Sequence, residues 1–305
     1  MSQRSAAVPT RFLLAVVLTA SLLSACAHVG PSSDRVLVIA SFYPLAEFAR
    51  RIGGDRVDVR TLIPAGVEPH DYEPSPRDIV TLERARLLIY NGAGFEPWMA
   101  RLLPELRSTV VQVNATAGMA LLHPEWSSGG PDPHVWLDPV RAQEQAARVL
   151  AGLIAVDPAA GARYERNARG LRSALEALQA RYEQGLRACR RKEFVTTHAA
   201  FGYLAVRYGL RQVPIAGLDP ESEPSPARLR LIIDFVRRSG ATVIYSEALI
   251  SPRTAETVAR ETGARVEVLN PLEGLTRDEL ARGLDYVTVM DANLNALARG
   301  LDCHR

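Results

Sequence analysis

Short apolar runs rich in valine and isoleucine alternate along the chain with segments in which apolar residues recur at helical spacing. A capping residue followed by proline precedes several of the helical segments. This alternation predicts an α/β protein with largely parallel sheets. The predicted strands are residues 36–41, 57–63, 87–91, 110–113, 194–197, 212–216, 242–246 and 266–269, and the capped starts are Ser75-Pro76, Asp138-Pro139, Asp157-Pro158, Ser225-Pro226 and Ser251-Pro252.

The segment between residues 158 and 189 departs from this rhythm. It has no strand pattern, and its apolar residues recur at intervals of three, four and seven, which predicts one long amphipathic helix. Such a helix would be roughly 45–50 Å long, more than the width of a lobe of about 120 residues. We therefore expect an N-terminal α/β lobe at residues 35–156, a linking helix at 157–190 and a C-terminal α/β lobe at 191–305.

The N-terminal segment has the pattern of a signal peptide. A polar start with Arg4 and Arg11 precedes an apolar run over residues 12–25, which is shorter than the roughly 20 residues that a membrane span requires. The run ends in Leu23-Ser24-Ala25-Cys26, which resembles a bacterial lipobox and implies that Cys26 becomes the lipidated first residue after residues 1–25 are removed. The alternative is a plain signal peptide cut after Ala25. Residues 26–34 then form a tether, and we expect a membrane-anchored protein outside the cytoplasm.

The composition excludes several classes of protein. The chain is 47% hydrophobic and 23% charged, as in an ordinary globular protein, with a formal net charge of +2. Without the leader it carries 34 basic and 34 acidic residues, so it has no general electrostatic attraction for nucleic acid. Lys192 is the only lysine and does not stand in a G-K-[ST] motif, which excludes a Walker-type nucleotide site.

Two cysteines, Cys189 and Cys303, remain beyond the leader. In an oxidising compartment such a pair can form a disulfide, which would close a loop of more than a hundred residues and hold the C-terminal tail. The alternative is two separate buried thiols. Neither interpretation makes a cysteine catalytic.

Three of the six histidines stand at strand ends or in the loops that follow predicted strands: His70, His134 and His198. Ligands of open α/β sheets gather where parallel strands end, at their carboxyl edge. Imidazole suits zinc, copper, nickel and iron, and three imidazoles leave room for a fourth ligand. The alternative is a set of isolated structural histidines. The other three, His28, His123 and His304, stand in a tether, a proline-rich loop and the C-terminus, where we expect exposure.

The segments around these histidines resemble the solute-binding lipoproteins of zinc and manganese ABC importers, the TroA-like family. The resemblance covers essentially the whole mature chain and implies two α/β lobes joined by one long rigid helix. It rests on Pro69-His70-Asp71-Tyr72-Glu73-Pro74-Ser75-Pro76, Pro133-His134-Val135-Trp136-Leu137-Asp138-Pro139 and Thr197-His198-Ala199-Ala200-Phe201-Gly202-Tyr203. Asn91-Gly92, Glu96-Pro97-Trp98, Ser246-Glu247, Leu269-Asn270-Pro271-Leu272 and the ending 286–294 add to it.

The resemblance implies that His70, His134 and His198 are metal ligands. His198 favours zinc, because manganese-selective members tend to carry a carboxylate at this position. The family's fourth position, often aspartate, is Asn270 here, and a neutral amide oxygen is a poor replacement. The fourth ligand is therefore expected to be water or one of the nearby acids Glu68, Glu73 and Glu247. Asn270 stays a candidate for the fourth ligand or for a supporting contact. Asp71 and Glu73 could also orient an imidazole by accepting its second N–H, or simply face water.

The function that this resemblance implies is capture and delivery without chemistry on the ligand. A monomer would bind zinc, or else manganese, between its lobes and pass it to the ABC permease of a metal importer. Three histidines plus water could also form a zinc hydrolase site, but the chain has no H-E-x-x-H helix and no G-x-S-x-G elbow. The remaining alternatives are a surface adhesin and a binder of siderophores or vitamins.

Overall fold

The computed structural model describes residues 35–124 and 130–304 of the 305-residue chain. The predicted signal peptide, the tether and Cys26 lie outside the described residues. Among the helices of the described part, none has both the length and the apolar character needed to cross a membrane.

The first sheet is built from the N-terminal third of the chain and is entirely parallel, with the strand order β2-β1-β3-β4. Side chains alternate between its faces, as expected for strands buried on both sides. Val38 and Leu87 face a core shared with α1 and α4, whereas Ile39 and Leu88 face α2 and α3. The strands are β1 (Val36–Ala40), β2 (Val57–Thr61), β3 (Leu87–Tyr90) and β4 (Val111–Asn114).

The second sheet is also entirely parallel and repeats the same order, β6-β5-β7-β8. Val195 and Ile244 pack on α7 and α8, and Phe194 and Tyr245 face the main core on the other side. Its strands are β5 (Glu193–Thr196), β6 (Arg211–Pro214), β7 (Val243–Ser246) and β8 (Arg265–Val268). The predicted fold class, α/β with two parallel sheets, is confirmed.

The helices begin largely where capping residues and proline predict them. Ser75, Asp138 and Ser225 accept hydrogen bonds from backbone N–H groups in the first turns of α2, α4 and α7. The helices are α1 (Tyr43–Gly53), α2 (Pro76–Glu83), α3 (Met99–Leu102), α4 (Pro139–Val156), α5 (Gly161–Leu186), α6 (Gly202–Arg207), α7 (Pro226–Ser239), α8 (Arg253–Thr262), α9 (Arg277–Ala281) and α10 (Tyr286–Gly300). The 3-10 helices of the described residues are Gly54–Arg56, Leu103–Glu105, Val135–Leu137 and Pro158–Ala160.

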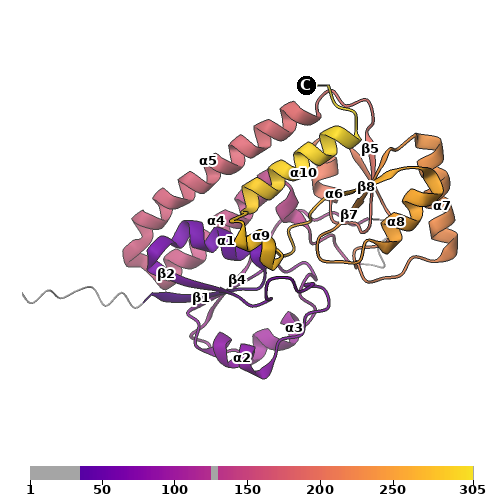
Figure 1. Cartoon of the computed structure of the whole chain (residues 1–305). Helices are drawn as coiled ribbons and strands as arrows, with labels where there is room; N and C mark the ends of the chain where they lie inside the picture. The colour runs from indigo at the N-terminus through magenta and orange to yellow at the C-terminus, as the bar shows by residue number, and fades with distance from the viewer. Residues whose placement is uncertain (1–34, 125–129, 305) are drawn as a thin grey trace, which may run out of the picture. The chain divides into compact units, whose positions relative to one another are not determined.

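The predicted long helix is α5, which has 26 residues and is about 39 Å long at the usual rise. It is shorter than the predicted 157–190 because Asp157-Pro158 starts a 3-10 helix and the chain leaves the helix after Leu186. Figure 1 shows α5 running from the helices of the first sheet to α10 at the far end. It packs on α1 and α4, which cover the first sheet, and on α10, which contacts β8 of the second sheet.

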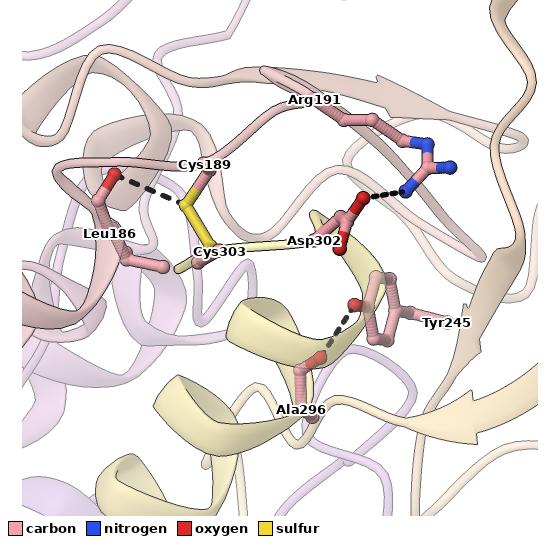
Figure 2. Close-up of a disulfide and its surroundings, with 7 residues drawn as sticks. All are labelled: Leu186, Cys189, Arg191, Tyr245, Ala296, Asp302 and Cys303. Carbon is pink, nitrogen blue, oxygen red and sulfur yellow. Dashed lines mark hydrogen bonds and ion pairs between the residues drawn. A yellow bond between two sulfur atoms is a disulfide. The ribbon is translucent and has the colours of Figure 1, made fainter. Parts of the chain in front are cut away.

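The sulfur atoms of Cys189 and Cys303 are bonded to each other, so the chain closes a loop across a sequence separation of 114 residues. Figure 2 shows the bond between the segments that follow α5 and α10. Two backbone hydrogen bonds, from Arg190 N to Asp302 O and from Arg191 N to Leu301 O, join the same two segments. The C-terminal tail is therefore held against the end of the long helix.

Several contacts join the halves that carry the two sheets. Arg207 of α6 pairs with Asp138 at the start of α4, with 2.7 Å between guanidinium nitrogen and carboxylate oxygen. The fully buried Trp136 donates its indole N–H to the carbonyl of Pro271, and its own carbonyl accepts the Tyr286 hydroxyl. These contacts hold the start of α4 and the loop before it against α6, α10 and the loop after β8.

Candidate metal site

The candidate site forms where loops from both sheets meet beyond the carboxyl ends of their strands. His198 follows β5 by two residues, and Glu273 stands in the loop after β8. His70 stands in the loop after β2, and His134 lies between β4 and α4. The parallel topology therefore brings together side chains that are up to 203 positions apart in the sequence.

Glu273 lies at the centre of the three imidazoles. Its Oε1 is 3.1 Å from His134 Nε2, 3.3 Å from His198 Nε2 and 3.5 Å from His70 Nε2. One ligand atom of each of these four residues lies within 4.8 Å of every other. Three nitrogens and one carboxylate oxygen around one point are a donor set that zinc takes.

The site is deeply buried, and its central atoms have no hydrogen-bond partner among the described residues. The side chains of His134 and His198 are 0% exposed and that of Glu273 is 1% exposed, whereas His70 keeps 13% exposure. The Nε2 atoms of all three histidines and both oxygens of Glu273 are buried without a hydrogen-bond partner. Buried polar groups left in this way are costly, and a cation at their common point would satisfy all of them.

Carboxylates behind two of the imidazoles set which ring nitrogen faces the centre. His134 Nδ1 lies 2.8 Å from Asp132 Oδ1, and His198 Nδ1 lies 2.7 Å from Glu247 Oε1. A neutral imidazole with its proton on Nδ1 presents the lone pair of Nε2 to the centre, as a metal ligand must. The hydrogen bond to Asp132 therefore holds His134 ready for coordination, and Glu247 lies at ion-pair distance behind His198.

The protonation of the metal-free cluster reflects these neighbours. Burial opposes a charge on His198, but the carboxylates of Glu247 and Glu273 outweigh burial and raise its pKa well above the usual 6.5. Burial likewise opposes a charge on His134, and Asp132 and Glu273 raise its pKa. Burial alone would raise the pKa of Glu273, but the adjacent histidines hold it well below its usual value. The carboxylates of the metal-free cluster thus favour positive charge at the imidazoles, which a metal cation would supply.

The residues expected for the fourth ligand position or for orienting an imidazole make other contacts or face solvent. Glu73 is exposed and pairs with Arg101 at 2.9 Å, Asp71 is exposed, and Asn270 is held in hydrogen bonds away from the centre. Glu247 stands behind His198, where it accepts the His198 backbone N–H. Glu68 accepts the His70 backbone N–H, and burial, followed by the charge of Glu273, raises its pKa to about 8.

Two of the contributing acids, Glu273 and Asp132, were not singled out by the sequence analysis. Both carried a signal: Glu273 follows a predicted strand at its carboxyl end, as His198 does, and Asp132 precedes His134 by two residues. The resemblance at the loop after β8 rests on Leu269-Asn270-Pro271-Leu272 and stops one residue before Glu273. His123 and His304 are exposed, as expected.

The fold and the cluster define a class, the two-sheet solute-binding proteins with metal-ligating side chains at the meeting point of their loops. Residues 38–300 match the protein family described as zinc-uptake complex component A, periplasmic, or ZnuA. The chain therefore belongs to the ZnuA family.

Individual relatives agree with this assignment. The high-affinity zinc uptake system protein ZnuA of Bacillus subtilis is 40% identical over 281 residues, 88% of each chain. The zinc-binding lipoprotein AdcA of Streptococcus pneumoniae is 38% identical over 303 residues, 95% of this chain but 60% of AdcA, so this chain spans little more than half of that relative.

Solved structures give the same picture. The Zn(II)-bound ZnuA-like domain of AdcA superposes with a TM-score of 0.78 at 39% identity, covering 88% of this chain and 99% of the domain. The laminin-binding protein Lmb of Streptococcus agalactiae, described as bifunctional with adhesin and metal transporting activity, has a TM-score of 0.80 at 34% identity, covering 88% and 99%.

Proposed function

We propose that this chain captures zinc between its two halves through His70, His134, His198 and Glu273. The observation that carries the proposal is the convergence of three imidazole nitrogens on one buried carboxylate, with every central atom lacking another partner. Three nitrogens and one oxygen favour zinc over manganese, since manganese prefers sites richer in oxygen. The names of the AdcA and ZnuA relatives support the same ion.

The proposal extends to delivery. The bound zinc would pass to the permease of an ABC importer, with the chain acting as a monomer outside the cytoplasm. Cys26 would carry the lipid that anchors it to the membrane, and residues 26–34 would form the tether. We also propose that residues 35–156 and 191–305 form two lobes and that residues 157–190 link them. AdcA, a relative named as a zinc-binding lipoprotein, supports it.

A hydrolase is a weaker interpretation of the same residues. Catalytic zinc sites commonly bind the metal with three protein ligands and keep one position for water. Here Glu273 contacts all three imidazoles and fills the fourth position, so the donor set matches a closed site. We therefore expect no turnover of ester, peptide or phosphate substrates by the zinc-loaded chain.

Adhesion is a second candidate function, which the likeness to Lmb supports. It is separable from zinc capture, because an adhesive surface need not include the buried cluster. Binding to laminin that is retained in variants of His134 and His198 would support it.

Metal stoichiometry and competition affinity test the main proposal. The soluble chain starting after Cys26 is stripped with a chelator and compared with His70→Ala, His134→Ala, His198→Ala and Glu273→Ala. The matched control is His123→Ala, because His123 is exposed and outside the cluster. We expect one tight zinc per chain, greatly weakened in the four variants and unchanged in the control. No tight zinc, or binding that ignores the four changes, would overturn the proposal.

A further inference from the structure

Leu272, which directly precedes Glu273, has an unusual backbone conformation. Its φ is +58°, in the left-handed region that residues with a bulky side chain rarely adopt. Its side chain is 0% exposed and packs in the main core, while the next side chain faces the three imidazoles. Leu272 is thus a buried anchor in the left-handed conformation, and it directly precedes a candidate ligand. Such a conformation persists only where surrounding contacts impose it.

Asn270 makes several of the contacts that hold this turn, beside the core packing of Leu272 and the Trp136 indole N–H on the Pro271 carbonyl. The Asn270 side-chain oxygen accepts the Leu272 N–H at 2.8 Å, and its side-chain nitrogen donates to Glu279 Oε1 at 3.1 Å. Its backbone N–H donates to Asn293 Oδ1 at 2.8 Å, and its carbonyl accepts Asn293 Nδ2 at 2.7 Å. Both asparagines are at least 95% buried. Asn270 therefore ties the turn to α10 through Asn293 and to α9 through Glu279.

Hydrogen bonds hold this turn together with packing. A pocket of about 550 Å³ opens beside Asn270 and is also lined by Asn293, Glu279 and other residues of β8, α9 and α10. Asn270 therefore has open space on that side, and its own position depends on its directional hydrogen bonds. The position of Glu273 depends on those bonds as well as on the packing of Leu272.

The same contacts explain why a neutral amide stands at position 270. The residue must accept from the Leu272 N–H and donate to the Glu279 carboxylate, and an amide side chain does both. An aspartate would keep the acceptor but place a second carboxylate at hydrogen-bond distance from Glu279, where like charges repel.

We propose that Asn270 is a positioning residue that sets the location of Glu273 and thereby the preference of the site for zinc over manganese. This inference rests on the proposed function. A carboxylate held at one point opposite three imidazoles completes the four-ligand set that zinc takes. Manganese accepts more ligands with more oxygen, so a displaced carboxylate replaced by water costs it less.

The test uses three altered chains. Asn270→Ala removes both side-chain bonds, and Asn270→Asp removes the donor to Glu279. Asn270→Asp combined with Glu279→Gln restores one donor and one acceptor with their positions exchanged, while the glutamine oxygen can still accept the Thr276 N–H. The control is Gln179→Ala on α5, because the Gln179 amide donates to Glu183 on that same helix.

We expect Asn270→Ala to weaken zinc binding by about 10- to 100-fold, as loss of a group that orients a metal ligand does, and to weaken manganese binding less. The absorption of bound Co²⁺ should lose the intensity typical of four-coordinate sites. The combined variant should recover most of the zinc affinity lost in Asn270→Asp, and the control should match the unaltered chain.

Two results overturn the inference. One is an unchanged zinc affinity and Co²⁺ spectrum in Asn270→Ala. The other is an equal loss for zinc and manganese with no recovery in the combined variant, which identifies a purely structural role. Both require tight zinc binding by the unaltered chain; if that is missing, the proposed function itself fails, so the two failures are distinguishable.

Discussion

At the scale of single residues, the three histidines differ in how firmly neighbouring groups hold their rings. His134 and His198 have a carboxylate behind the ring and no exposure, whereas His70 is partly exposed. The His70 backbone donates to Glu68, and its ring packs edge-on to Phe95 with 5.1 Å between centroids. Two imidazoles are thus fixed by charge and burial, and the third is placed mainly by its loop.

The carboxylates behind the rings should contribute to zinc affinity without touching the metal. Asp132→Asn and Glu247→Gln keep the side-chain size but remove the charge that supports each imidazole. We expect each change to weaken zinc binding by about 10- to 100-fold. Competition with a chelator of known affinity measures this, and Glu83→Gln on the exposed side of α2 is the control. Equal affinity in all four chains would contradict the role assigned to these acids.

Zinc affinity should fall as pH decreases, and the fall should begin above pH 6.5. Zinc requires neutral imidazoles, and the pKa values of His134 and His198 are raised in the metal-free fold, so protons compete with the metal from a higher pH. The same raised pKa values stabilise the metal-free fold below about pH 6.5, and this contribution is lost as pH rises through them. Titrations between about pH 8 and pH 5.5 test this, and a flat affinity would contradict it.

At the scale of helices and strands, the sequence predicted the elements well because their signals are local. Each of the eight predicted strands overlaps an observed strand, with ends that differ by at most two residues. Alternation of apolar runs and cap-proline pairs is a property of neighbouring residues, so it can be read without knowing the fold. The ends of α5 were less clear, since apolar spacing continues beyond the last helical hydrogen bonds.

The candidate site was predictable only in part. The histidines were found because the three segments around them resemble a family, whereas Glu273 stands in a loop without periodicity. Its role depends on Leu272 and Asn270 bending that loop and on contacts with residues 75 to 203 positions away. Contacts over such separations follow from the topology, and a local pattern does not contain them.

Two glycines in helices should respond oppositely to alanine. A Cβ at Gly300, at the end of α10, would lie 2.1 Å from the Tyr245 hydroxyl, which donates to the Ala296 carbonyl. A Cβ at Gly170, within α5, would meet nothing within 4 Å. We expect Gly300→Ala to lower the free energy of unfolding by about 1–3 kcal/mol. Gly170→Ala should raise it by about 0.5–1 kcal/mol.

Urea unfolding of the two glycine variants measures both values, and each variant controls for the other. A stable Gly300→Ala chain would mean that Tyr245 can move without cost. A destabilised Gly170→Ala chain would mean that this stretch of α5 has a partner in solution.

At the scale of the whole described chain, two sheets with the same strand order are joined through α5 and through the loops at the site. The site uses loops from both sheets, so bound zinc would add another connection between the two halves of the chain. Ligand binding to the folded state alone raises stability by mass action. Zinc capture and the cohesion of the two halves are therefore linked.

Removing the disulfide should destabilise the protein while sparing the site. The bond closes a loop across 114 positions, and a cross-link over a long loop typically contributes about 2–4 kcal/mol. We expect Cys189→Ser combined with Cys303→Ser to lose about this much free energy of unfolding, with zinc stoichiometry unchanged. Reductant should lower the stability of the unaltered chain and leave the variant unaffected. Equal stability of both chains under oxidising conditions would contradict the prediction.

The covalent ring between Cys189 and Cys303 also encloses every strand of the second sheet and helices α6 to α10. A protease that cuts one peptide bond inside this ring opens it without releasing a fragment, because the sulfur bridge still joins the two pieces. On a non-reducing gel the nicked chain would keep its full mass, and it would separate into two bands only after reduction. A cut before residue 189 has no such bridge, so the two halves of one polypeptide would differ in how they survive proteolysis.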